Sequence, residues 1–258
     1  DWLASELVDS GWSRKHIHKL IAMSATYRQS AKASPEMLQA DPGNRLLTRG
    51  PRFRLPAELV RDNALAISGL LSTKMYGPPV MPHQPAGTWR SVGRNQPQWQ
   101  AAEDEDRFRR GVYVVWKRAA PYPSFVNFDA PDRSSCTVNR PKTNTPLQAL
   151  TLLNDPAYAE MALAFADRVL RESPETTDDG RVRFAMRLAL SREGKIQETD
   201  LLQRLLESER GFLDGETKLI DARTKPTCEA LRIQCTDKQE LAAWFAVANA
   251  LLNLDETV

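Results

Sequence analysis

Apolar residues recur at helical spacing along most of the chain. The clearest stretch in the first half runs from Leu55 to Leu71, with Pro56 at its start and an apolar stripe of Leu59 or Val60, Ala64, Ile67 and Leu71. Similar stripes lie within residues 13–24, 156–169, 181–190, 198–212 and 238–252. Such a repeat is typical of amphipathic α-helices that bury one face. The pattern predicts a mainly α protein whose last third is a helical bundle.

Two helix starts are marked by capping residues. Thr145-Pro-Leu-Gln148 matches the S/T-x-x-E/Q capping box and places proline at the first helical position. Asp155, followed by proline, is expected to cap the next helix. We interpret Thr145, Gln148 and Asp155 as structural caps, with a sharp bend at Asn154 and Asp155.

One short segment has the composition of a β-strand. Gly111-Val-Tyr-Val-Val-Trp116 is β-branched and aromatic, and Thr88–Val92 is the nearest candidate partner. Proline and glycine between Tyr76 and Trp99 predict a long surface loop, and a polar loop containing Pro226 is expected before the last helix. The expected fold is a helical bundle-like domain with long ordered loops and a small two-stranded β element.

A weak boundary near residues 173–179 divides the expected domain. Residues 1–172 would form a helical part with proline- and aromatic-rich loops. Residues 173–258 would form a C-terminal helical bundle packed on the first part as one unit.

Composition narrows the function classes. The 258 residues are 41% hydrophobic and 26% charged, with a net charge of +2, which are ordinary values for a globular protein. Basic residues are scattered among acidic neighbours, so nucleic-acid binding is not indicated. No apolar run approaches the roughly 18 residues that span a bilayer, so no membrane span is expected. The chain begins at Asp1 inside a helical pattern, which suggests a fragment, and no signal peptide is present.

Catalytic and metal-binding motifs are absent. The sequence contains no GxGxxG, GxxxxGK[ST], GxSxG or HExxH. Its three cysteines lack CxxC and CxxCH spacing, which disfavours a zinc site or attached haem within the chain. His16 and His18 point about 200° apart on a helix, so they cannot share a metal, and His83 lies in the proline-rich loop. We predict no cofactor or metal in this chain.

Cys228 and Cys235 have two interpretations. They could close a small disulfide loop in an oxidising compartment, or remain two separate thiols.

The segment from Phe128 to Asp155 is the best candidate for binding. It is polar and turn-rich before it enters a short apolar helix, and such loops often carry binding residues. The candidate ligand or partner loop contains Phe128, Asp129, Asp132, Arg133, Cys136 and Asn144.

Catalysis by this segment is the less favoured interpretation. Cys136 has arginines nearby that would activate a thiol, but a buried structural thiol is the preferred prediction. Asp129 and Asp132 could form a glycosidase-type carboxylate pair, but a turn with local ion pairing is preferred. The middle third is rich in aromatic residues, which could stack on sugars but are expected to pack loops onto helices: Trp89, Trp99, Tyr113, Trp116, Tyr122, Phe125 and Phe128.

Several motifs together carry a family resemblance that spans nearly the whole chain. The most specific are Phe128-Asp-Ala-Pro-Asp132, Cys136, Thr143-Asn-Thr-Pro-Leu-Gln-Ala-Leu150 and Leu153-Asn-Asp155. Further matches are Asp1-Trp-Leu-Ala4, Gly11-Trp-Ser13, His18–Ser30, Asn44–Leu47, Leu55–Asp62, Gly77–Val80, Arg110–Tyr113, Ala242–Trp244 and Leu251–Asp255. The chain resembles a domain of unknown function found in planctomycetes and related bacteria.

The resemblance implies a place within a larger protein. Members of that family form the C-terminal part of exported proteins, typically behind a c-type cytochrome module and a second uncharacterised domain. It therefore implies a periplasmic or otherwise exported parent with haem c in an upstream domain, and no established catalytic residue.

The leading hypothesis is an accessory or binding domain, non-catalytic in itself, whose partners are other domains of the parent protein. A helical module whose aromatic loops dock the cytochrome domain is a closely related hypothesis. The alternative is a carbohydrate-active enzyme domain or polysaccharide-binding module that uses Asp129, Asp132, Arg133 and the aromatic residues of the middle loops.

Overall fold

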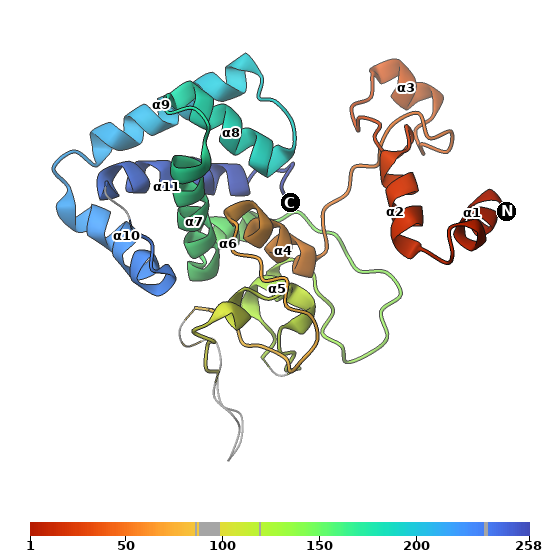
Figure 1. Ribbon diagram of the computed structural model, residues 1–258, viewed down its shortest axis with the longest axis horizontal. Helices are drawn as coiled ribbons and strands as arrows, with labels where there is room; N and C mark the ends of the chain where they lie inside the picture. Colours follow the sequence, from red (N-terminus) through yellow and green to blue (C-terminus); the bar gives the residue numbers. More distant parts are fainter. Residues whose placement is uncertain (86, 88–98, 119, 235–236) are drawn as a thin grey trace, which may run out of the picture. The chain divides into compact units, whose positions relative to one another are not determined.

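The computed structural model describes residues 1–85, 87, 99–118, 120–234 and 237–258 (Figure 1). The chain divides into two compact units, Asp1–Phe53 and Arg54–Val258. Eleven α-helices lie in the described part of the chain, so the mainly α prediction is confirmed. The predicted division at residue 172 stays a prediction, and each unit is described below by itself.

The first unit contains three short helices, α1 (Trp2–Asp9), α2 (Arg14–Met23) and α3 (Pro35–Ala40). Ser13 caps α2 through the His16 amide, as its position in the sequence suggests. Ser34 caps α3 through the Met37 amide, and Pro35 lies in the first turn of this helix. None of the hydrophobic residues of this unit is buried.

The second unit is built around one central helix. Its elements are α4 (Ala57–Ser68), α5 (Pro123–Asn127), α6 (Pro146–Asn154), α7 (Pro156–Glu172), α8 (Asp178–Leu190), α9 (Ile196–Phe212), α10 (Thr217–Leu231) and α11 (Lys238–Leu252). Helix α7 packs against α4, α6, α8, α10 and α11 (Figure 1). Residues 161–166 of α7 are all buried, so this helix has core contacts on every side.

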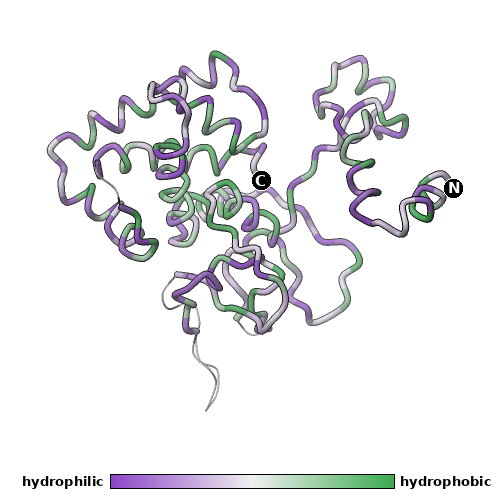
Figure 2. Tube along the Cα trace, viewed as in Figure 1, coloured by the Kyte–Doolittle hydropathy of each residue, from purple (hydrophilic) through white to green (hydrophobic). Residues whose placement is uncertain are grey.

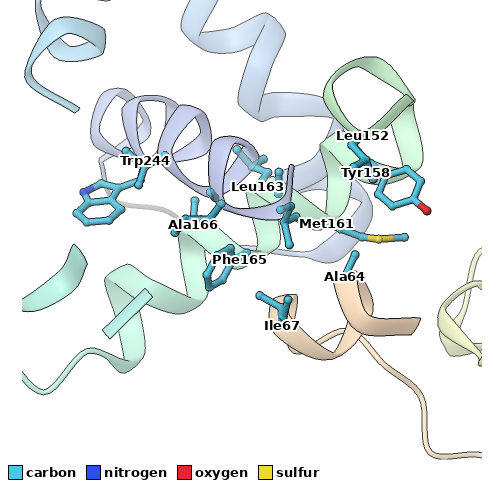
Figure 3. Close-up of a cluster of buried hydrophobic side chains, with 14 of the residues drawn as sticks. Ala64, Ile67, Leu152, Tyr158, Met161, Leu163, Phe165, Ala166 and Trp244 are labelled. Carbon is cyan, nitrogen blue, oxygen red and sulfur yellow. The ribbon is translucent and has the colours of Figure 1, made fainter. Parts of the chain in front are cut away.

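The core surrounds α7. Figure 3 shows Leu163, Phe165 and Ala166 of this helix beside Trp244 of α11 and Ile67 of α4. The outer helices are amphipathic: green and purple segments alternate along α8 and α9 in Figure 2. The last third is therefore a bundle whose apolar stripes close over α7 and α11.

The predicted two-stranded β element is wrong where the structure can test it. Gly111–Tyr113 forms a 3-10 helix, η2, and Val114 makes only an isolated parallel bridge with Val80. The segment cannot extend as a strand because the Gly111 amide donates to the Asp62 carboxylate at 2.6 Å. A Cβ at Gly111 would lie 2.9 Å from the Glu58 backbone oxygen, so α4 holds this backbone closely. The proposed partner, residues 88–92, lies outside the described residues.

The predicted loop around Pro226 is also wrong, because this proline lies inside α10. Proline removes a helical hydrogen bond and usually disfavours this position. Here Ile220 and Thr224 are buried on the face of α10 that meets α7 and α11. Tertiary packing therefore outweighs the local preference of proline.

The loop between Tyr76 and Trp99 is described only in part. Val80 is buried and exchanges backbone hydrogen bonds with Tyr113 and Val115, while residues 86 and 88–98 are not described. Within the described ranges, we find no helix long and apolar enough to span a bilayer.

Candidate functional site

The base of the candidate loop is closed by Asp129 and Thr143. The Thr143 amide and hydroxyl donate to the two carboxylate oxygens of Asp129 at 2.7 and 2.9 Å. Arg54 donates to the same carboxylate at 2.5 Å. Asp129 has a φ of +60°, a left-handed conformation that aspartate and asparagine tolerate better than most residues. Residues 130–142 therefore leave and re-enter the fold at one point.

Gln148 ties this base to α6. Its side-chain oxygen accepts from Arg54 at 2.7 Å, and its side-chain nitrogen donates to the Asn127 carbonyl at 2.9 Å. The predicted capping box is present, since Gln148 also accepts from the Thr145 amide. Gln148 therefore starts the helix and also anchors the loop.

Opposing influences act on the Asp129 carboxyl. Burial alone would raise its pKa, but the hydrogen bonds from Arg54 and Thr143 outweigh it and hold the pKa below the ordinary 3.8. Phe128 lies buried beneath, with the Arg54 guanidinium 5.6 Å from its ring centre. The carboxylate is therefore ionised and fully engaged at neutral pH.

Above its base, the loop is braced at two points. The guanidinium of Arg133 lies 4.4 Å from the Trp116 ring centre. Arg140 makes two hydrogen bonds to the Glu58 carboxylate, at 2.6 and 3.2 Å. These contacts fix the flanks of the loop against α4 and the segment that follows η2.

The tip of the loop faces solvent. Residues 134–139 are all exposed, and Val138 exposes 95% of its surface. Cys136 is exposed as well, so the prediction of a buried structural thiol is wrong. The closure at Asp129 by Arg54 and Thr143 leaves the tip of the loop outside the core. Asn144 is also exposed, whereas Phe128 is buried.

The two loop aspartates have separate hydrogen-bond partners. The amide and hydroxyl of Ser134 occupy both oxygens of Asp132, at 2.9 and 2.8 Å. These hydrogen bonds lower the pKa of Asp132. A glycosidase acid needs a raised pKa, and both Asp129 and Asp132 are shifted the other way. Local turn and ion-pair contacts account for both side chains.

The aromatic residues of the described part of the chain pack loops onto helices, which is the role that the sequence analysis preferred for them. Trp99 stacks on Tyr122 with ring centres 6.0 Å apart, and Trp116 stacks on Phe125 at 6.3 Å. Tyr122 meets Phe125 edge-on at 5.1 Å. Trp89 lies outside the described residues.

Sequence reasoning missed a buried polar cluster next to these rings. Arg61, only 1% exposed, donates to the backbone carbonyls of Arg109 and Arg107, each at 2.7 Å. Arg107 in turn pairs with Glu160 at 2.6 Å. Burial raises the pKa of Glu160 and raises that of Tyr122 to about 12. No local signal marked this cluster, because the carbonyls that accept from Arg61 lie more than 40 residues away in the sequence.

The remaining chemical candidates have separate environments. His16 pairs with Glu6 at 2.7 Å. The His83 carbonyl accepts from the Tyr122 hydroxyl, and burial lowers the pKa of the His83 ring. No group of three or more His, Cys, Asp and Glu side chains arranged for a metal ion occurs among the described residues. Cys235 is not described, so the predicted Cys228–Cys235 alternatives stay untested.

Replacing Asp129 tests the base of the loop. Asparagine tolerates the positive φ but cannot form the ion pair with Arg54. Asp129→Asn should therefore lower the free energy needed to open the loop by about 1–2 kcal/mol. Trypsin cleavage after Arg133 and Lys142 should become about tenfold faster. The matched control is Asp132→Asn, which removes a charge from the exposed turn. Equal cleavage rates in the two variants would contradict the proposed closure.

Asp155 offers a pH-dependent test. It caps α7 through the Ala157 amide at 2.9 Å. Burial raises the pKa of its carboxyl above the ordinary 3.8, and the Ala157 amide and Arg61 only partly offset this. The folded state therefore binds this proton more tightly than the unfolded state does. The ionised carboxylate costs stability at neutral pH, and this cost fades as the pH falls through the folded-state pKa.

We therefore expect Asp155→Asn to be at least as stable as the parent chain at pH 7, because asparagine is an equally good cap. Its advantage should shrink as the pH falls toward 3.8. Asp155→Ala, which lacks the cap, should be about 1 kcal/mol less stable than the asparagine variant throughout. Urea unfolding across this pH range measures both effects. A deficit of the asparagine variant at pH 7 that disappears in acid would reverse the expected sign.

Comparison with known proteins identifies a family. A family model described as "Protein of unknown function (DUF1553)", PSD1, matches residues 1–206. No curated protein and no solved structure matches the chain.

Proposed function

The chain belongs to the PSD1 family of proteins of unknown function (DUF1553), and from that premise we propose that it is an accessory binding domain of a larger exported protein. The parent protein would be of planctomycete type and would carry haem c in an upstream domain, as the motif resemblance suggests. The chain would bind another domain of that parent without catalysing a reaction itself.

The construction of the loop at residues 129–144 carries this proposal. Its charged side chains are engaged in holding it in place: Asp129 with Arg54, Arg140 with Glu58, and Asp132 with Ser134. The tip that they present is uncharged and exposed, from Ser134 to Asn139. A loop that already holds its conformation before it meets a partner loses little conformational entropy on binding.

The same contacts argue against a catalytic role for the loop. General acid–base catalysis requires a group whose pKa lies near the working pH. The loop carboxylates are shifted below their ordinary values by hydrogen bonds that already use their oxygens. Polysaccharide binding stays a prediction, since no contact described here favours it.

Binding between separately expressed parts of the parent protein tests the proposal. The 258-residue chain would be titrated calorimetrically with the haem-containing part encoded by the same gene. We expect binding, and at least a tenfold loss of affinity for Val138→Asp, which places a charge at the loop tip. Val112→Asp is the matched control, because Val112 is also exposed, on the 3-10 helix.

Two results would overturn this function. One is absence of binding by the unmodified chain at accessible concentrations. The other is turnover of a glycan by the purified chain that Asp132→Ala abolishes.

A further inference from the structure

Two hydroxyl groups inside the second unit are buried without a hydrogen-bond partner. Tyr158 on α7 and Ser124 on α5 each expose only 1% of their surfaces. Neither hydroxyl has a partner of acceptable geometry among the residues that the structure describes. A buried hydroxyl without a partner costs free energy, and folded proteins rarely contain one. We therefore expect a small molecule to complete the hydrogen bonding of both groups.

These two hydroxyls lie next to a third, that of Tyr122, the residue that precedes α5. Burial raises the pKa of Tyr122, to about 12, and also raises that of Tyr158, while the Ser124 hydroxyl lies close enough to both tyrosines to oppose this rise. Figure 3 shows the hydroxyl of Tyr158 turned away from Leu163 in the apolar core. Three hydroxyls from α5, its cap and α7 therefore converge at the edge of the core.

The hydrogen-bonding capacity of the three hydroxyls suits a molecule that both accepts and donates. The Tyr122 hydroxyl already donates to the His83 carbonyl at 2.7 Å, so it can only accept from a further group. Ser124 and Tyr158 each still have a proton to donate. A molecule that accepts from these two and donates to Tyr122 would satisfy all three side chains.

The charges around the hydroxyls favour an uncharged molecule. Besides the effect of burial, Arg61 lowers the pKa of both tyrosines and Asp155 raises it, so one charge of each sign faces them. The neighbouring pair of Arg107 and Glu160, 2.6 Å apart, adds a second charge of each sign. Asp155 would repel an anion and Arg61 would repel a cation, and both effects are strong in a buried site.

We propose that Ser124, Tyr122 and Tyr158 bind one ordered water molecule. The water accepts hydrogen bonds from Ser124 and Tyr158 and donates one to Tyr122. Three hydrogen bonds to otherwise unsatisfied polar groups are typical of a buried water. It links α5 to α7 at the edge of the core. The site is separate from the loop at residues 129–144, so the proposal is independent of the function proposed above.

The signs of two stability changes test the proposal on the full 258-residue chain. If a water links the hydroxyls, Tyr158→Phe and Ser124→Ala each leave the water and the remaining hydroxyl with fewer hydrogen bonds. We expect each change to raise the unfolding equilibrium constant about tenfold. The double variant should raise it no further than a single change does, because both changes remove the same link. Urea unfolding followed by circular dichroism measures these constants.

The matched controls are Tyr76→Phe and Ser208→Ala, because both side chains are exposed. Each control should change the unfolding constant by less than about threefold. A crystal structure of the chain should show one ordered water at about 2.5–3.0 Å from both the Ser124 Oγ and the Tyr158 Oη atoms. The water should be absent from a crystal structure of the double variant.

Three results would overturn the proposal. One is an unfolding constant that falls or stays the same in both single variants, since removal of an unpartnered buried hydroxyl relieves its desolvation cost. Another is a crystal structure in which Tyr158 donates directly to Ser124. The third is an ion at this position, which a crystal soaked in bromide would reveal by anomalous scattering.

Discussion

Arg61→Met should lower the free energy of unfolding by about 3–5 kcal/mol, one of the two largest effects we expect from a single change. The guanidinium is almost fully buried on α4 and donates to two backbone carbonyls in the segment of residues 107–109. Methionine fills much of the same volume but leaves those carbonyls without a donor. It also removes the positive charge that faces the buried carboxyls of Asp155 and Glu160.

Urea unfolding followed by circular dichroism measures this loss, and the melting temperature should fall by about 10 °C. The control is Arg183→Met, because Arg183 lies on the exposed face of α8 and pairs with Asp179, four residues away. That change should cost less than about 0.5 kcal/mol. If the two variants lose similar amounts of unfolding free energy, Arg61 does not organise the segment around η2.

Phe165→Ala should cost about 3–5 kcal/mol through lost burial and the cavity left behind. Phe165 is fully buried on α7 and lies among core residues of α4, α7 and α11 (Figure 3). Because α7 contacts so many neighbouring helices, the cavity cannot close by the movement of one neighbour alone. The loss should therefore fall in the upper part of that range.

The control for this change is Phe212→Ala at the end of α9. Phe212 is 59% exposed, and the Arg223 guanidinium lies 5.9 Å from its ring centre. We expect a loss below about 1 kcal/mol. Urea midpoints for both variants, with unchanged slopes, provide the measurement. A small loss at Phe165 would mean that α7 is not the centre of the core.

The helix starts could be predicted because their signals are local. Thr145 and Gln148 form the capping box within four residues, and Asp155 needs only the amide of Ala157. The apolar stripe of α11 is likewise contained in one stretch of sequence. Each of these features depends on chain neighbours alone, so the sequence is sufficient to infer it.

The missed features depend on distant residues. Gly111–Tyr113 has strand-like side chains, yet its backbone follows the Asp62 carboxylate 49 residues earlier. Pro226 remains helical because α10 packs on α7 and α11. A buried arginine is equally invisible to a periodicity argument, since Arg61 becomes acceptable only once carbonyls from residues 107 and 109 surround it.

The candidate loop combines a local feature that could be predicted with a distant contact that could not. Its polar, turn-rich composition correctly predicted an irregular segment that feeds α6. The closure through Arg54 could not be read from the sequence, because Arg54 lies 75 residues before Asp129. Exposure of Cys136 follows from that closure, which lifts the tip away from the core.

The two ends of the second unit meet in space. The Leu55 amide donates to the Val258 carbonyl at 2.6 Å, and the Asn63 side chain reaches the Thr257 carbonyl at 2.9 Å. A circular permutant of residues 54–258 should therefore have the same core. In it, a short linker joins residue 258 to residue 54, and the new termini lie at the exposed turn between α9 and α10. The order in which these helices are synthesised is then separable from the architecture they adopt.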